Sequence, residues 1–78
     1  MAQNMQEWLA GFAAEIGVTP PAQEELDMLL ELAGVAARAS ERPAAPLTCW
    51  LVGRAGLSPR DALAAGRRLA GEGEANGG

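Results

Sequence analysis

The stretch PPAQEELDMLLELAGVAAR, residues 20–38, decides the fold that the sequence predicts. At 100° per residue, a helix over these residues carries apolar side chains on one face and also on a second arc. The face comprises Leu26, Leu29, Leu30, Ala33 and Ala37, and the arc comprises Met28, Leu32 and Val35. The clear polar stripe comprises Asp27, Glu31 and Arg38. A helix that is apolar around most of its circumference is central in its domain or has one side in an interface.

On the N-terminal side of this stretch, residues 5–16 predict a shorter helix. Asn4 and Glu7 have the spacing of a capping box, and Gly17 is a natural helix stop. One arc of this helix carries Met5, Trp8, Leu9, Phe12 and Ile16. For the longer helix that follows, we expect Thr19 as N-cap and Pro20 in the first position, because proline is well tolerated there.

On the C-terminal side, the segment SERPAAP, residues 40–46, interrupts the helical pattern. Proline in a helix interior costs about 3 kcal/mol and pushes the preceding residue toward extended conformations, so we expect a stiff, extended connector. A third helix is predicted over residues 47–55, ending at Gly56. Ser58 followed by Pro59 is a strong start for a fourth helix over residues 59–70.

These patterns predict an all-α protein, a compact four-helix domain with helices at about 5–16, 20–38, 47–55 and 59–70. The second and third helices are expected to be central. We expect one domain over residues 1–70, followed by a disordered tail over residues 71–78, which has nothing to bury.

Composition narrows the classes of function. The chain has 78 residues, a net charge of −4, no histidine and one cysteine. An acidic balance disfavours broad attraction to nucleic acid or membrane surfaces. A single cysteine cannot form an internal disulfide, and no apolar run approaches the ~20 residues of a membrane span. We therefore expect a cytoplasmic protein that does not contact membranes.

No residue pattern predicts catalysis, a cofactor or a metal site. Cys49 lies near the start of the third helix, where a thiol pKa can be lowered, but the chain contains no histidine base and no second cysteine. We expect both Cys49 and Trp50 to be core residues. Asp27 and Glu31 lie one turn apart and could share a hard cation, but such a pair is more often a solvated helix face. The chain is therefore not expected to be an enzyme.

Two surfaces are candidates for binding. The second arc of the long helix, Met28, Leu32 and Val35, is a candidate interface with a protein partner or with another copy of the chain. Arg42 lies near the free N–H groups that open the third helix, so it is a candidate contact for an anion or a partner.

DNA binding is the alternative function. The segment LVGRAGLSPRDALAAGRRLA, residues 51–70, has the order of a helix-turn-helix reader, with Arg60, Arg67 and Arg68 as possible DNA contacts. The third helix is apolar for a helix that crosses a DNA backbone, and Asp61 places a negative charge near the reading end. Nucleic acid is therefore the less favoured partner.

Trp8, the middle segment LLELAGVAARASERPAAPLTCWLVGRAG and the later segment SPRDALAAGRRLA together resemble a small, uncharacterised actinobacterial domain family. Members of that family occur alone or alongside, and sometimes fused to, molybdenum-cofactor guanylyltransferases, the molybdopterin-guanine dinucleotide biosynthesis proteins. The resemblance covers nearly the whole chain except the tail, and Arg42 to Thr48 is its most specific part. It implies an accessory or interaction domain whose protein partner is a molybdenum-cofactor guanylyltransferase, and it implies no catalytic residues.

Overall fold

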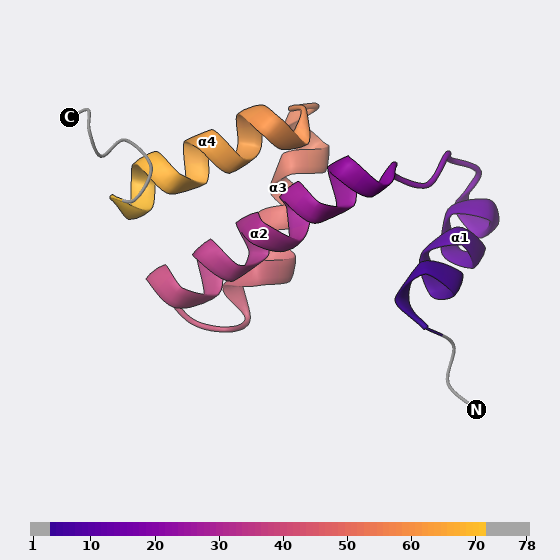
Figure 1. Cartoon of the computed structure of the whole chain (residues 1–78), viewed down its shortest axis with the longest axis horizontal. Helices are drawn as coiled ribbons and strands as arrows, with labels where there is room; N and C mark the ends of the chain where they lie inside the picture. Colours follow the sequence, from indigo (N-terminus) through magenta and orange to yellow (C-terminus); the bar gives the residue numbers. More distant parts are fainter. Residues whose placement is uncertain (1–3, 72–78) are drawn as a thin grey trace.

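A computed structural model of the chain describes residues 4–71 and contains four helices. They are α1 (Met5–Ile16), α2 (Gln23–Ala39), α3 (Ala44–Ala55) and α4 (Pro59–Ala70), arranged as shown in Figure 1. No strand occurs between residues 4 and 71. The predicted all-α class with four helices is confirmed. Residues 72–78, most of the tail predicted to be disordered, lie outside the described part of the chain.

Helices α1 and α4 begin and end where their capping residues predict. The Glu7 N–H donates to Asn4 Oδ1 at 2.7 Å, and the Asn4 N–H donates to Glu7 Oε1 at 3.2 Å, which completes the capping box of α1. At the start of α4, Ser58 Oγ accepts a hydrogen bond from the Asp61 N–H at 3.1 Å. These bonds satisfy N–H groups that a helix start otherwise leaves unpaired.

The start of α2 differs from the prediction by three residues. Pro20 and Pro21 precede the helix, and Ala22, rather than Thr19, is the N-cap residue. Pro21 disfavours helical geometry at Pro20, so a helix cannot readily begin there. Ala22 has no polar side chain, and Glu25 provides the capping contact instead, accepting the Ala22 N–H at 2.9 Å.

The link between α2 and α3 is a tight turn and not the extended connector that was predicted. Pro43 has helical backbone angles, φ −63° and ψ −14°, and the Ala44 N–H donates to the Glu41 carbonyl at 2.8 Å. Helix α3 therefore starts at Ala44, and Pro46 is its third residue. Proline is tolerated there because N–H groups of the first turn have no partner within the helix.

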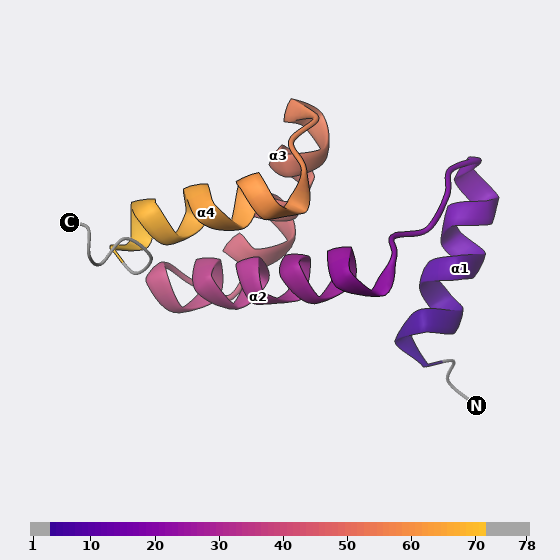
Figure 2. The same cartoon turned by 45° about the horizontal axis from the view of Figure 1, so that its top comes forward.

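Helix α2 is the centre of the fold, as predicted, because it packs against both α3 and α4 (Figure 2). Leu32 and Val35 of α2 are each 2% exposed and form a core with Ala62 and Leu63 of α4. Gly66 permits the close approach of α4, since a Cβ atom at this position would lie 2.5 Å from Leu32 Cδ1.

The prediction that the third helix is central is wrong. No side chain of α3 is buried, and Trp50, expected in the core, is 60% exposed. The reason lies in the packing: only one side of α3 faces α2, and no other helix within residues 4–71 covers its opposite side.

Helix α1 lies beside the N-terminal end of α2, apart from α3 and α4 (Figures 1 and 2). A shallow hollow of Gln6, Leu9 and Ala10 faces Pro20, Pro21 and Leu26. Ala13 and Leu26 are buried at this end of the molecule. Helix α1 is therefore attached through its Leu9–Ala13 side, and the rest of its circumference is open.

Candidate interaction surface

The interface predicted on α2 is not available at the surface. Leu32 and Val35 are buried in the core, and Met28 is half-buried and packs against it. The arc that carries Leu32 and Val35 faces the other helices of the same chain, so it is not an exposed interface on α2. The second apolar arc of α2 explains its central position instead.

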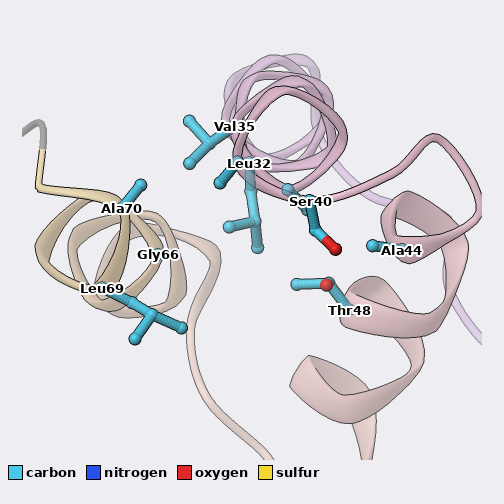
Figure 3. Close-up of a pocket in the computed structure, with 10 residues that line it drawn as sticks. Leu32, Val35, Ser40, Ala44, Thr48, Gly66, Leu69 and Ala70 are labelled. Atoms are coloured by element: carbon cyan, nitrogen blue, oxygen red, sulfur yellow. The ribbon is translucent and has the colours of Figure 1, made fainter.

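The open apolar surface lies between α3 and α4. Two adjoining hollows, with volumes of about 260 and 280 Å³, share Leu32, Thr48, Gly66 and Leu69 in their lining. Figure 3 shows Leu32 pointing from α2 into this space, with Thr48 of α3 on one side and Leu69 of α4 on the other. The two hollows form one groove, which we call the α3–α4 groove.

Small side chains produce this groove. Its lining includes Ala36 and Ala39 at the end of α2, Ala44 at the start of α3, and Ala65 and Gly66 on α4. These residues allow α3 and α4 to sit close to α2, yet they are too short to fill the space between α3 and α4. The groove is therefore an apolar channel whose floor is the core leucine, Leu32.

Large apolar side chains border the groove and face solvent. Leu69 on α4 and Leu51 on α3 line the groove and are 92% and 58% exposed, and Leu47, one turn before Leu51, is 65% exposed. Leu47, Trp50 and Leu51 follow the i, i+3, i+4 spacing that places residues on one helix face. The Arg54 guanidinium lies over the Trp50 ring at 5.5 Å, a cation–π contact that partly covers the indole.

A second open apolar surface lies on α1. The rings of Trp8 and Phe12 stack with centroids 6.0 Å apart, and these side chains are 58% and 50% exposed. Met5 and Ile16 extend the same arc and are 41% and 56% exposed. We call these four residues the α1 arc. Neither the α1 arc nor the border of the groove is covered by another part of residues 4–71.

Charge divides the chain into two unlike halves. Residues 4–41 contain seven carboxylates and one arginine, whereas residues 42–71 contain five arginines and one aspartate. The halves are joined by an ion pair between Arg67 of α4 and Glu31 of α2. The net charge of −4 thus conceals a basic region over α3 and α4.

The arginines singled out by sequence do not form one site. Arg42 is exposed in the turn before α3, and only its backbone carbonyl has a hydrogen-bond partner within residues 4–71, the Ala45 N–H at 3.1 Å. Arg60 and Arg68 are exposed at opposite ends of α4, while Arg67 is held by Glu31.

Cys49 is half-buried in the second turn of α3. Burial disfavours the thiolate and raises the pKa of Cys49, so the thiol is a weaker nucleophile than an exposed cysteine. Among residues 4–71, no three His, Cys, Asp or Glu side chains gather in a way that could hold a metal ion. No helix in this part of the chain is both long and apolar enough to cross a membrane.

Residues 1–76 match the family model of a domain of unknown function, DUF6457. The chain belongs to this family. The match spans all four helices of the described chain. No curated protein and no solved structure matches the chain.

Sequence reasoning missed the residues that make this surface. The third helix, which carries Leu47 and Leu51, was expected to be central, and Trp8 and Phe12 were placed on one apolar arc with no binding role. A signal was available: α3 is apolar on more than one side, and a 12-residue helix cannot bury two sides against α2 alone. This signal did not reveal which side of α3 remains uncovered, because the uncovered side depends on the direction of the turn at Pro43.

Proposed function

We propose that this chain is a non-catalytic interaction domain that binds an apolar helix of a protein partner in the α3–α4 groove. The observation that carries the proposal is the groove itself, with Leu32 as its floor and the exposed Leu51 and Leu69 at its edges. An amphipathic helix laid into an apolar groove is a recurring mode of protein recognition. The domain is proposed to act in the cytoplasm.

The energetics favour an occupant in this groove. Complete burial of a leucine side chain is worth roughly 1.5–3 kcal/mol, and Leu69, at 92% exposed, has nearly all of that to gain. An apolar patch of several such side chains marks an interaction site on a protein surface. The thiol of Cys49, with its raised pKa, supports a non-catalytic role.

A molybdenum-cofactor guanylyltransferase is the proposed partner, on the strength of the resemblance carried by Arg42 to Thr48 and its flanking segments. The test is a binding titration of the full chain with a purified guanylyltransferase of the same organism. We expect saturable binding that Leu69→Glu abolishes. Leu30→Glu is the matched control, because Leu30 is 49% exposed on α2 and does not line the groove. Absence of binding would reject this partner, and binding unchanged by Leu69→Glu would reject the groove.

DNA binding has weaker support. Arg60 and Arg68 are exposed, but Arg67 is paired with Glu31, and Asp61 lies in the first turn of α4, where a reading helix would meet the DNA. A gel-shift series at low and rising salt tests this alternative, since binding through phosphate contacts weakens steeply with salt. We expect no shift at low salt, and a shift lost in Arg60→Ala would favour the DNA-binding alternative.

A further inference from the structure

We infer that α1 of a second copy of this chain occupies the α3–α4 groove, so that two copies form a reciprocal dimer. The inference rests on the proposed binding role of the groove and names one occupant for it. Each copy would contribute one α1 arc and one groove, and the two contacts would be related by two-fold symmetry. A partner helix and a second copy would then compete for the same groove.

Helix α1 has the chemistry of a groove ligand. The α1 arc is a continuous stripe of large apolar side chains, and about half of the Trp8 and Phe12 side chains is still exposed. A helix of 12 residues is marginal in water unless tertiary packing covers its apolar face. Helix α1 therefore gains stability when a second surface covers this arc.

The attachment of α1 holds this helix at the N-terminal end of α2, apart from the groove between α3 and α4. Leu9 and Ala10 face Leu26 and the two prolines of the linker. To enter the groove of its own chain, α1 would have to abandon this contact and expose Leu26. A second copy can receive the α1 arc while the contact at Leu26 stays intact.

The charges of the two surfaces are complementary. Helix α1 carries Glu7 and Glu15 and no basic residue, and Glu15 lies beside Trp8 and Phe12. Helices α3 and α4 carry four arginines and one aspartate. An acidic helix that approaches this basic region is attracted, whereas α3 and α4 of two copies repel one another.

The area is that of a stable dimer. The four side chains of the α1 arc are each about half exposed, and so are Leu51 and Leu57, which line the groove, with Leu69 more so. If each of these seven side chains covers about 100 Å², one copy covers roughly 700 Å² in the two contacts. A standard interface covers about 800 Å² per partner.

Light scattering of the full chain over a range of concentrations tests the inference. We expect twice the chain mass of 8.0 kDa, and half of that value for either Trp8→Glu or Leu69→Glu. Leu30→Glu, which alters neither surface, is expected to remain dimeric. Circular dichroism on every variant checks that the helices are retained, since Trp8 and Leu69 are exposed and outside the core.

Mixing the two variants sharpens the test. The Trp8→Glu chain keeps its groove and the Leu69→Glu chain keeps its α1 arc. In the mixture, the α1 arc of the Leu69→Glu chain can therefore bind the groove of the Trp8→Glu chain. We expect a dimer in the mixture although each variant alone is monomeric. Recovery of dimer distinguishes an α1-in-groove contact from contacts between two α1 helices or two grooves, neither of which mixing restores.

The inference and the proposed function fail in different ways. A wild-type chain that is monomeric at all concentrations overturns the dimer, while binding of a guanylyltransferase lost in Leu69→Glu still supports the groove. A monomer in which Trp8 is shielded from acrylamide, measured in a Trp50→Phe chain, shows that α1 occupies its own groove and also overturns the dimer. A dimer unaffected by Leu69→Glu shows that the groove is not its interface.

Discussion

Helices α1 and α4 have the same length, 12 residues, and both are capped at each end, yet they differ in how much of their apolar surface is buried. Helix α4 carries mostly alanine, glycine and arginine, and it buries Ala62 and Leu63 against α2. Helix α1 carries Trp8 and Phe12, and about half of each stays exposed. Burial in this fold follows close approach and not side-chain size, because small residues let two helix axes come near each other.

The largest expected effect lies in the contact between α2 and α4. Leu32→Ala removes the side chain at the centre of the core and should lower the free energy of unfolding by about 2–5 kcal/mol. Urea unfolding followed by circular dichroism measures the change. Phe12→Ala is the counterpart on α1, and in the Leu69→Glu background, where α1 has no groove to enter, it should cost under about 0.5 kcal/mol. Equal losses for the two variants would show that α1 belongs to the same cooperative core.

Substitution of two glycines by alanine should have intermediate effects of opposite sign: one destabilises the fold and the other stabilises a helix. Gly66→Ala places a Cβ atom 2.5 Å from Leu32 Cδ1, and overpacking of this kind costs about 1–3 kcal/mol, more than the gain in helix propensity. Gly11→Ala on α1 meets no atom within 4 Å and should raise the helicity of α1, since alanine is favoured over glycine by about 1 kcal/mol. Thermal unfolding and helical circular dichroism report the two results. A stabilised Gly66→Ala chain would mean that α4 does not need close approach to α2.

The smallest expected effects come from removing the N-cap hydrogen bonds of α4 and α1. Ser58→Ala removes the acceptor for the Asp61 N–H and should lower the unfolding free energy of the whole core by about 1 kcal/mol. Asn4→Ala removes the matching contact on α1, and we expect lower helicity with little change in the unfolding midpoint of the core. Hydrogen exchange of the two helices separates local fraying from global unfolding. Strong protection of α1 amides, equal to that of α4, would contradict the difference between the helices.

The helix ends were largely predictable from sequence, and the exceptions have local causes. Asn4 with Glu7, and Ser58 with Pro59, set the start of α1 and α4 because a cap is made by residues three or fewer positions apart. The predicted start of α2 was wrong because the second of two consecutive prolines disfavours helical geometry at the first. The predicted start of α3 was wrong because residues 40–46 were expected to form an extended connector, whereas the helix begins at Ala44 and Pro46 is its third residue.

The candidate site was not predictable in the same way. Trp8, Leu47, Trp50 and Leu51 have the spacing of core residues, and spacing alone does not show whether a partner helix from the same chain covers them. The groove arises because Ala65 and Gly66 bring α4 close to α2 without filling the space beside α3. Met28, Leu32 and Val35 were predicted to be a surface for the converse reason, since nothing local shows that α3 and α4 converge on that arc.

The sequence by itself determined four helices, the limits of α1 and α4 and the central place of α2, because caps, helix stops and an apolar circumference act within a few residues. Only the tertiary structure decided which apolar faces are covered. The turn at Pro43 sets the direction of α3, and the linker at Pro20 and Pro21 holds α1 at the end of α2. Burial depends on these directions over the whole chain, and they leave an apolar groove and an apolar helix open on the same molecule.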